Sequence, residues 1–561
     1  MCGIFVSYGP QINFSSHKKL TNHLIHRGPD NQGHLKINDN MMFGHTRLSI
    51  IDNSKASNQP FSDGYSIVLF NGMIYNYLEI KLKLKNFYNF KTKSDTEVIS
   101  AAYKYWGKKC FNEFNGMFSI VIYDLKLKEI IVARDRLGIK PLYYRAVKKN
   151  YYFSSEIKPL LKIEKYNQDL KTVYNYFQNS TYETYENTFF EEVKQFLPGN
   201  YYVFKNYKLK NTVNYWNLKS KINPKNKIYS IQTAKEIFAN EFERIKNYYI
   251  RSDRKIGLLY SSGLDSNFIL DLINRDRKNI SLLLTFGFKA LNIKDEIGDL
   301  TKCNIKSFTH RFDIDEFFKF AEKTQIEQEM PWGGPNVLFQ GYLLNKAKKL
   351  KHNVVLSADG ADEIFGGYQK YLNLKKINSN YINQAIDGSF PYNSSLFKKT
   401  FNTYKENIFE RKYDKNIHNY AKYLDITFSK LPRNFRFSDR FSMNQSVELR
   451  YPFLDHKLIE LSFRLSKSLQ INNKENKIVL RRLFNYTRKK RHINSPQTEW
   501  FYNNKFKKKM YEICNDSPIF DHVLDRDKVR EYCNFFYEKK RNNSFKLWQI
   551  YNYDLWLKTF F

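Results

Sequence analysis

Two patterns of hydrophobic and polar positions divide the chain. Up to about residue 160, short runs rich in β-branched and aromatic side chains are separated by Gly, Asn and Asp, which predicts strands joined by turns. The runs with this pattern are MMFGHTRLSII (41–51), YSIVLFNG (65–72), MFSIVIYD (117–124), EIIVARD (129–135) and NYYFSS (150–155). A helix is predicted at SDTEVISAAYKYWG, where Ser94 or Asp95 provides the N-cap and Gly107 the stop. We therefore expect a layered α+β domain in this region.

From about Ser230 onward, long helical patterns alternate with apolar strands. The helix pattern KEIFANEFERIKNYY (235–249) is followed by the strand patterns KIGLLYSSG (255–263), SLLLTFGF (281–288) and HNVVLSADG (352–360). This alternation predicts a parallel sheet with crossover helices, an α/β domain. The end, FKLWQIYNYDLWLKTFF (545–561), is expected to pack as a helix, because Lys, Asn and Asp interrupt its apolar positions. We place the domain boundary where the pattern changes, which gives domains 1–212 and 213–561.

Composition limits the class of protein. A chain of 561 residues is too long for one core, and a hydrophobic content of 42% suits a globular protein. No run approaches the roughly 18 to 20 apolar residues of a membrane span, and the start, MCGIFVSYGP, lacks the features of a secretory signal. The cysteines form no C-x-x-C pair, so neither a zinc site nor a disulfide framework is expected, and the cytoplasm is the predicted compartment. They are Cys2, Cys110, Cys303, Cys514 and Cys533.

The net charge of +36 raises the question of nucleic-acid binding. Lys and Arg are, however, spread along the whole chain among Asn, Tyr, Phe and Ile, without a zinc finger, an RNP-type motif or a long basic block. Such a diffuse distribution is typical of a residue bias in the whole sequence, so nucleic acid is not expected as a partner. The sequence leaves a monomer and a homodimer open.

Cys2 is the first candidate for catalysis. If Met1 is removed, the α-amino group of Cys2, with a pKa of roughly 8, can act as a base beside the thiol. Taken alone, Cys2 is better interpreted as an ordinary small buried residue. Seven motifs in order change that balance: CGIF (2–5), HRGPD (26–30), HTRLSII (45–51), NGMIYNY (71–77), SDTEV (94–98), NGMF (115–118) and ARDRLGIKPLYY (133–144). Together they resemble the class II glutamine amidotransferase domain, an N-terminal-nucleophile glutaminase with an α-β-β-α fold.

The resemblance implies roles for individual residues. Cys2 attacks the glutamine amide, forms a thioester and releases ammonia, while Asn71 and the N–H of Gly72 donate to the developing oxyanion. Arg47 holds the glutamine α-carboxylate as a bidentate fork, and Asp95 pairs with the α-ammonium. The structural alternatives are an ion pair for Arg47 and a helix N-cap for Asp95.

One departure concerns glutamine binding. The family usually has Glu after Asn-Gly, and Met73 occupies that position here. Glutamine affinity is lowered if the Glu side chain makes the family contact, and is little changed if the backbone makes it. The sequence leaves both possibilities open.

A second set of motifs indicates ATP chemistry. KIGLLYSSGLDSNFIL (255–270) places a strand, a loop of small residues and a helix in succession, so that backbone N–H groups and the helix N-terminus can approach an anion. The loop is not a Walker A motif, and it is also consistent with a serine-rich turn that caps a helix. It resembles the S-G-G-x-D-S pyrophosphate loop of N-type ATP pyrophosphatases, with Ser262 replacing the first Gly. A serine is tolerable at this position if its backbone keeps φ below zero. By that match, Asp265 also helps to hold Mg²⁺, and the phosphate-binding residues are Ser261, Ser262, Gly263, Asp265 and Ser266.

A further segment, VVLSADGADEIFGGY (354–368), resembles S-G-E-G-x-D-E-x-F-G-G-Y of the glutamine-hydrolysing asparagine synthetases. By that match, Ser357 and Ala358 approach the nucleotide, and Asp362 joins Asp265 at Mg²⁺. Asp359 takes the place of the usual catalytic Glu and is one methylene shorter.

Matches to this family continue to the end of the chain. SDRFSMNQSVELRYPFLD (438–455) resembles its D-R-x-S-M and E-x-R-x-P-F-L-D motifs, and KIVLRR (477–482) matches K-x-x-L-R. Lys477 is thereby expected to be the cation over the phosphates, and Leu259 and Phe286 are expected to line the adenine site. The resemblance therefore spans essentially the whole chain.

The implied reaction uses glutamine, ATP and a carboxylate acceptor. ATP converts the carboxylate to an acyl-adenylate with loss of pyrophosphate, and ammonia from the first site attacks it after passing through an apolar interior. Arg27 and Met117 lie in motifs that line the domain interface and are predicted to line this tunnel. A non-catalytic relative is the alternative from another class, because Met73, Ser262 and Asp359 depart from the family pattern.

The acceptor is expected to be aspartate. However, QIEQEMPWGGPNVLFQGYLL (325–344) and SPQTEW (495–500) look closer to asparagine-synthetase-like enzymes encoded with surface-polysaccharide genes, so a sugar uronate is the alternative. Residues 326–342 offer Glu327 and Glu329 but no arginine. Trp332 is either a platform on which the ring of an acceptor stacks or a core Trp over a tight turn.

Overall fold

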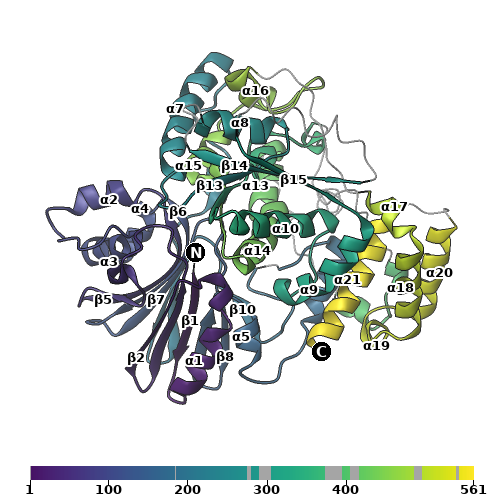
Figure 1. Cartoon of the computed structure of the whole chain (residues 1–561), viewed down its shortest axis with the longest axis horizontal. Helices are drawn as coiled ribbons and strands as arrows, with labels where there is room; N and C mark the ends of the chain where they lie inside the picture. Colours follow the sequence, from purple (N-terminus) through teal and green to yellow (C-terminus); the bar gives the residue numbers. More distant parts are fainter. Residues whose placement is uncertain are drawn as a thin grey trace.

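The computed structural model consists of an N-terminal part with two antiparallel sheets and a C-terminal part built around one parallel sheet (Figure 1). The predicted α+β and α/β classes are thus confirmed. The structure describes residues 2–183, 185–274, 279–289, 305–372, 374, 394–404, 416–485, 496–538 and 543–561, so Cys303 lies outside the described residues.

The N-terminal part contains two six-stranded sheets whose strand pairs are all antiparallel. The first sheet has the order β10 (Val193–Gln195), β8 (Tyr143–Val147), β9 (Asn150–Ser154), β1 (Gly3–Tyr8), β3 (Met41–Arg47) and β2 (Asn31–Asn38). The second has the order β12 (Lys208–Asn214), β11 (Asn200–Lys205), β7 (Glu129–Arg134), β6 (Gly116–Asp124), β5 (Ser66–Ile74) and β4 (Phe61–Ser62). All five runs predicted as strands are therefore strands.

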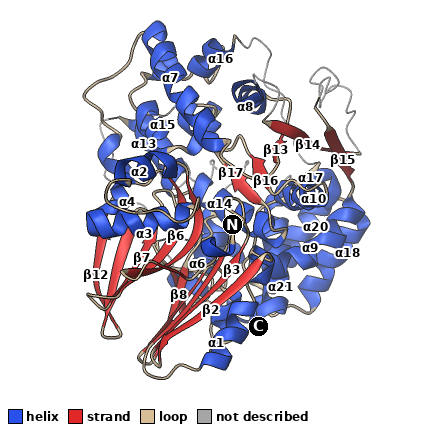
Figure 2. Cartoon of the chain, turned by 60° about the vertical axis from the view of Figure 1, so that its left-hand side comes forward, coloured by secondary structure: helices blue, strands red, loops and turns tan. Residues whose placement is uncertain are grey.

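The two sheets pack face to face and bury alternate residues of each strand. Ile4 and Val6 of β1 join Leu69 and Val121 of the other sheet in this shared core. Phe5, between them, belongs to the other face of β1, where its ring lies 5.3 Å from that of His17 in α1. This alternation is the period of two that a strand imposes, and it produces the four-layered α-β-β-α arrangement seen in Figure 2. The helices of this part are α1 (Phe14–Asn22), α2 (Tyr77–Leu84), α3 (Asp95–Trp106), α4 (Cys110–Glu113), α5 (Lys158–Leu161) and α6 (Leu170–Asn179).

The predicted helix at 94–107 is confirmed as α3, and the structure decides between its two candidate caps. The side chain of Ser94 accepts a hydrogen bond from the N–H of Thr96, so Ser94 is the N-cap and Asp95 is the first helical residue. Gly107 ends the helix with φ of 58°, in the region that favours glycine. Asp95 is therefore available for a role other than capping.

In the C-terminal part, five parallel strands form a sheet with β13 at its centre. Their order is β15 (Ser307–Phe312), β14 (Ile280–Phe288), β13 (Ile256–Leu259), β16 (Val354–Leu356) and β17 (Glu448–Arg450). The chain runs outward from β13 to β14 and β15, then returns to the other side of β13 for β16 and β17. This reversal creates a crevice at the carboxyl ends of β13 and β16, the usual place of a ligand in such sheets.

Helices surround the parallel sheet and extend from it to the C-terminus (Figure 1). They are α7 (Ile231–Tyr249), α8 (Leu264–Asn274), α9 (Ile314–Gln328), α10 (Pro335–Lys349), α11 (Ala361–Phe365), α13 (Ile417–Thr427), α14 (Lys430–Asn444), α15 (His456–Ser462), α16 (Ile478–Phe484), α17 (Gln497–Phe501), α18 (Asn504–Asn515), α19 (Ile519–His522), α20 (Arg526–Tyr537) and α21 (Ser544–Phe560). In the described part of the chain, no helix combines the length and apolar character needed to cross a bilayer.

The final helix, α21, packs back against the N-terminal part, as predicted for a packed helix. Tyr166 donates a hydrogen bond from its hydroxyl to the carbonyl oxygen of Phe560 at 2.7 Å, and Gln549 donates to that of Tyr176 at 2.7 Å. The Trp556 ring meets those of Phe189 and Phe190 edge to face, each at 5.5 Å. The chain end thus helps to hold the two parts in a fixed arrangement.

Candidate active sites

Residues that are predicted to bind or hydrolyse glutamine come from several elements and line one small cavity. Cys2, at the start of β1, shares this cavity with Arg47 of β3, Gly72 and Met73 of β5, and Asp95 of α3. The cavity has a volume of about 30 Å³ and is open on one side.

Asn71 lies next to Cys2 with one hydrogen-bond donor unused. The backbone N–H of Cys2 donates to Asn71 Oδ1 at 3.0 Å, whereas Asn71 Nδ2 is buried and makes no hydrogen bond to any described residue. A buried donor without a partner costs about 1–3 kcal/mol, so its persistence beside a thiol suits a group that binds a developing oxyanion. At Gly72, an added Cβ would lie 2.1 Å from the carbonyl oxygen of Met117, so the close approach of β5 and β6 requires glycine.

The guanidinium of Arg47 contacts a loop beside the cavity. Its terminal nitrogens, Nη1 and Nη2, donate to four oxygens of the segment 51–58, including Ser54 O at 3.1 Å and Asn58 Oδ1 at 2.8 Å. Only Nε then remains to meet a glutamine carboxylate. In this conformation the guanidinium holds the loop beside the cavity, and its binding of the glutamine α-carboxylate stays a prediction.

Asp95 presents a buried carboxylate to the cavity. The N–H of Ile74 donates to Asp95 Oδ2 at 3.1 Å and holds the side chain in place. Burial raises the pKa of Asp95 to about 7, and the charges of Glu448 and Cys2 contribute to the increase. A cation bound beside this carboxylate would favour its ionised form, as the predicted contact with the α-ammonium requires.

We expect kcat/KM for glutamine to rise with pH up to about 7 and then to level off. The reason is that only ionised Asp95 attracts the α-ammonium, and its pKa of about 7 places this ionisation within the measurable range. Cys2, Glu448, Arg47 and Tyr77 are the other titratable groups that face or influence this carboxyl. Glutamate release measured from pH 5.5 to 8.5 tests this. The rise of kcat/KM with pH should disappear in Asp95→Asn. A wild-type kcat/KM that does not change between pH 6 and 8 would contradict the role of Asp95 in binding the α-ammonium.

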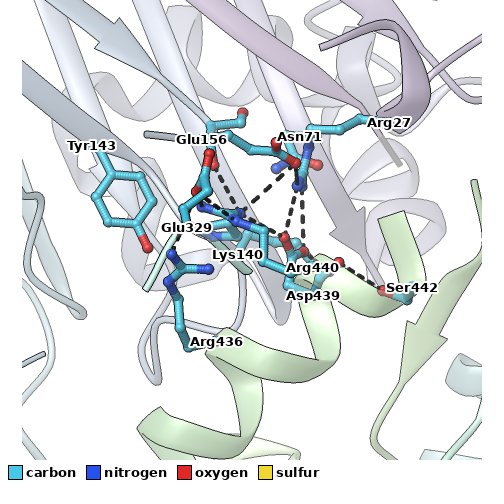
Figure 3. Close-up of polar contacts among 12 residues, drawn as sticks. Arg27, Asn71, Lys140, Tyr143, Glu156, Glu329, Arg436, Asp439, Arg440 and Ser442 are labelled. Atoms are coloured by element: carbon cyan, nitrogen blue, oxygen red, sulfur yellow. Dashed lines mark hydrogen bonds and ion pairs between the residues drawn. The ribbon is translucent and has the colours of Figure 1, made fainter. Parts of the chain in front are cut away.

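A buried network of charges joins the glutamine cavity to α14 (Figure 3). Arg27 donates from Nε to the carbonyl oxygen of Cys2 at 3.0 Å and from Nη1 to Glu156 and Asp439, both at 2.8 Å. Lys140 Nζ lies 3.2 Å from Asp439 Oδ1. Although burial acts in the opposite direction, the charges of Arg27 and Lys140 hold the pKa of Asp439 below its usual range.

This network has consequences for the predicted tunnel residues. Removing one partner from a buried ion network leaves an uncompensated charge and typically costs about 3–5 kcal/mol, so the network holds the two parts of the chain in register. The Arg27 guanidinium is held by its contacts within this network, and Met117 is fully buried on β6. That these two residues line an ammonia tunnel stays a prediction.

A second, larger cavity of about 350 Å³ lies at the carboxyl ends of β13, β14 and β16. It occupies the crevice that the strand order creates. The structure brings together eight of the residues predicted for ATP, phosphate or Mg²⁺ and the predicted catalytic residue Asp359. The eight are Leu259, Ser261, Asp265, Ser266, Phe286, Ser357, Ala358 and Asp362. Ser262 and Gly263 belong to the same loop but do not line the cavity.

Ser262 does not have the backbone conformation that the sequence interpretation required. Its φ is 52°, in the left-handed region, so the condition under which a serine is easily tolerated there is not met. The conformation costs a non-glycine residue roughly 1–2 kcal/mol. Asn267 Nδ2 offsets part of this cost by donating to Ser262 O at 2.8 Å and to Gly263 O at 2.9 Å. The tight turn, and not the residue type, decides the conformation here.

Lys477 lies between the two predicted metal ligands. Its Nζ is 2.5 Å from Asp265 Oδ2 and 2.8 Å from Asp362 Oδ1. Burial alone lowers the pKa of Lys477, but the two carboxylates outweigh that effect and raise it. Two facing carboxylates also fit Mg²⁺, which prefers oxygen ligands, and phosphate and water oxygens would complete its coordination. The lysine therefore neutralises the same pair of charges that a magnesium ion would.

Asp359, the predicted replacement for a catalytic Glu, faces the cavity. The Ser357 hydroxyl donates to Asp359 Oδ2 at 2.9 Å. Burial, together with the charges of Asp362 and Asp265, raises the pKa of Asp359 above its ordinary value. A raised pKa makes the ionised carboxylate a stronger proton acceptor.

The sequence interpretation missed several residues that line the two cavities. In the larger cavity they include Gln340, Glu363, Asn434, Phe437 and Ser438, and in the glutamine cavity they include Gln59 and Glu448. Glu363 and Glu448 lie inside motifs that carried the family resemblance, which is the signal that could have found them. Ser438 begins the motif at 438–455, whereas Gln340, Asn434 and Phe437 come from α10 and α14 and lie outside the motifs matched to the family.

Trp332 belongs to the core, so its interpretation as a stacking platform is wrong and the alternative holds. The side chain is 0% exposed, and its ring packs edge to face on Trp548 with the centroids 4.8 Å apart. Glu329 is also buried, and it accepts a hydrogen bond from Arg440 Nε at 2.9 Å. Only the later part of the predicted acceptor segment, at Val337 and Gln340, reaches the larger cavity.

Trp332→Ala is accordingly expected to destabilise the fold by about 3–5 kcal/mol, because it empties a fully buried site. Urea unfolding should show a lower midpoint, whereas the KM values for glutamine, ATP and acceptor should change together or not at all. Trp332→Phe fills more of the space and should lose less stability. A selective increase in the acceptor KM would restore the stacking hypothesis.

Two cavities in one chain, one beside a cysteine near the N-terminus and one at the crevice of a parallel sheet, fit a two-part amidotransferase. Comparison with known proteins supports this class. Residues 1–216 match the family described as glutamine amidotransferase domain, and residues 240–558 match the family described as asparagine synthase. The chain therefore belongs to the glutamine-dependent asparagine synthetase family.

Two named relatives illustrate the extent of the similarity. Glutamine-hydrolyzing asparagine synthetase 1 of Bacillus subtilis (strain 168) is 26% identical, in an alignment that covers 96% of this chain and 93% of that protein. Glutamine-hydrolyzing asparagine synthetase 2 of the same organism is also 26% identical, over 88% of this chain and 70% of that protein. The similarity therefore extends across both parts of the chain.

Proposed function

We propose that this protein releases ammonia from glutamine at Cys2 and uses it to amidate a carboxylate that ATP has activated, with AMP and pyrophosphate as products. The observation that carries the proposal is the presence of two separate cavities in one chain, each lined by the residues of one half-reaction. Arg27 and Asp439 connect them through buried ion pairs. Aspartate is the first acceptor we propose.

In the first half-reaction, the Cys2 thiolate attacks the side-chain amide carbon of glutamine. Asn71 Nδ2, which has no partner among the described residues, donates to the oxyanion, and the Gly72 N–H is the proposed second donor. Collapse of the tetrahedral adduct breaks the carbon–nitrogen bond and releases ammonia, leaving a thioester on Cys2. Water then attacks the thioester and yields glutamate and the free thiol.

In the second half-reaction, a carboxylate oxygen of the acceptor attacks the α-phosphorus of ATP and pyrophosphate leaves. Ser261 and Ser266 are positioned to bind the phosphates, and Lys477 can pass from the two aspartates to the departing anion. Asp265 and Asp362 would hold magnesium, which supplies positive charge against the phosphates. Ammonia attacks the acyl carbon, AMP leaves, and Asp359 accepts a proton from the new ammonium group.

A sugar acid is the second acceptor that an observation favours. In the described lining of the larger cavity, Gln340, Asn434 and Ser438 offer amide and hydroxyl groups, and no Lys or Arg is present. Amides and hydroxyls suit the hydroxyl groups of a uronate, whereas the α-carboxylate of aspartate is usually met by a cation.

The test is glutamine-dependent release of AMP and pyrophosphate measured across a panel of carboxylates that includes aspartate and a uronate-bearing nucleotide sugar. We expect one member of the panel to give saturable amide formation. Conversion of aspartate to asparagine without any response to sugar acids would reject the sugar alternative. Release of ADP instead of AMP would reject the adenylation chemistry for every acceptor.

A further inference from the structure

A carboxylate from the asparagine-synthase region lies in the glutamine cavity. Glu448 lines the same cavity as Cys2, Arg47 and Asp95, although it belongs to β17 of the parallel sheet. The residue is only 1% exposed. The wall of this cavity is thus built from both family regions of the chain, and the N-terminal part alone does not complete it.

The position of Glu448 is firmly determined. Its backbone N–H donates to Asn353 O at 2.7 Å, and Arg450 Nε donates to its Oε1 at 2.6 Å. Arg450 is itself anchored, because its Nη1 donates to the carbonyl oxygens of Tyr249 and Arg251, both at 2.8 Å. The carboxylate is therefore pre-organised before any ligand binds.

The charges around the cavity match a zwitterion. A bound glutamine carries an α-carboxylate and an α-ammonium, and the cavity wall holds one cation, Arg47, with two carboxylates, Asp95 and Glu448. Asp95 and Glu448 line the same small cavity, so their negative charges repel each other, in line with the raised pKa of Asp95. An ammonium group between the two carboxylates would relieve that repulsion. The carboxylates would also offset the free-energy cost of removing the ammonium from water.

Met73 strengthens this argument. It lines the cavity with an apolar side chain, so this wall of the site provides no acidic group at that position. Asp95 is then the single carboxylate that the described N-terminal lining contributes. The second carboxylate comes from β17.

We propose that Glu448 is a specificity-determining residue for glutamine, which binds the α-ammonium together with Asp95 across the boundary between the two family regions. The proposal rests on the proposed hydrolysis of glutamine at Cys2. It makes recognition of glutamine depend on the docking of the parallel-sheet part. A purely structural role, in which Glu448 only orients Arg450, is the competing explanation.

The test compares glutamine with 4-carbamoylbutanoate, which is glutamine without its α-amino group. Glu448→Gln keeps the side-chain length and an oxygen for Arg450 but removes the charge. We expect the wild type to prefer glutamine in kcat/KM by more than tenfold, and this preference to fall at least tenfold in Glu448→Gln. Amidation supplied with ammonium chloride should remain within about twofold of the wild type.

Two further variants separate recognition from structure. Glu448→Asp keeps the charge and should retain most of the preference for glutamine. Glu79→Gln removes a different ion pair between the two parts, Glu79 with Arg251 at 2.6 Å, and should leave the preference unchanged. Both controls use the full chain.

Each outcome decides the question. A preference that is unchanged in Glu448→Gln, or lost equally in the Gln and Asp variants, would overturn the role in recognition, as would a wild type that does not discriminate between the two substrates. If the wild type hydrolyses neither substrate but still uses ammonia, the proposed glutaminase function fails instead. Thermal unfolding of each variant identifies any loss that comes from misfolding.

Discussion

Replacing Cys2 with Ala is expected to abolish glutamine hydrolysis, lowering kcat by at least about 10³-fold, while amidation with free ammonia continues. The thiol is the only group in the described cavity lining that can form the thioester. The nucleotide cavity contains none of the groups that surround Cys2, so its chemistry needs only the nitrogen. The measurements are glutamate release from glutamine and AMP release with ammonium chloride as the nitrogen source.

Cys110→Ala is the matched control, since Cys110 is also a buried cysteine of the N-terminal part but does not line the glutamine cavity. It should retain glutaminase activity to the extent that the protein remains folded. If Cys2→Ala were folded and had lost both activities, the two sites would not act separately. Residual glutaminase activity at the wild-type rate would remove Cys2 from the mechanism altogether.

Asp265→Asn and Asp362→Asn are each expected to lower pyrophosphate release by about 10²- to 10³-fold and to leave glutamine hydrolysis unchanged. Each substitution removes one of the two charges that face Lys477 and that would hold magnesium. The glutamine cavity includes neither residue. Pyrophosphate and glutamate should be measured in the same reaction, with saturating Mg²⁺ and ATP.

Asp271→Asn is the control for these two variants. Asp271 lies on the same helix as Asp265 but is exposed, so its charge should not affect the reaction. Full pyrophosphate release by Asp265→Asn would show that this carboxylate does not act on the phosphates. Parallel loss of glutamine hydrolysis would indicate a general folding defect, which unfolding curves can reveal.

Local patterns predicted those features of the fold that depend on neighbouring residues. Alternation of apolar residues identified β5 and β6, and helical spacing with a stop at Gly107 identified α3. The pattern did not predict α1, α2 or α6, which are short and rich in polar or aromatic residues. Tertiary packing stabilises such helices against a sheet, and intrinsic propensity contributes less.

Motif order predicted many of the residues that meet in each cavity, because a motif marks a segment whose local geometry is set by the reaction it supports. It could not predict how a side chain is used after folding. Arg47 reaches its cavity, but its terminal nitrogens are occupied by a loop. Ser262 takes a left-handed conformation because the turn requires it.

By itself the sequence determined the two fold classes, the family and the two sets of motif residues, since these depend on short-range spacing and on residue type. Only the tertiary structure decided that Trp332 is core, that Lys477 bridges Asp265 and Asp362, and that Glu448 enters the glutamine cavity. These features depend on contacts between segments far apart in the chain. Such contacts follow from how whole sheets and helices pack, and no local pattern of hydrophobic and polar residues records them.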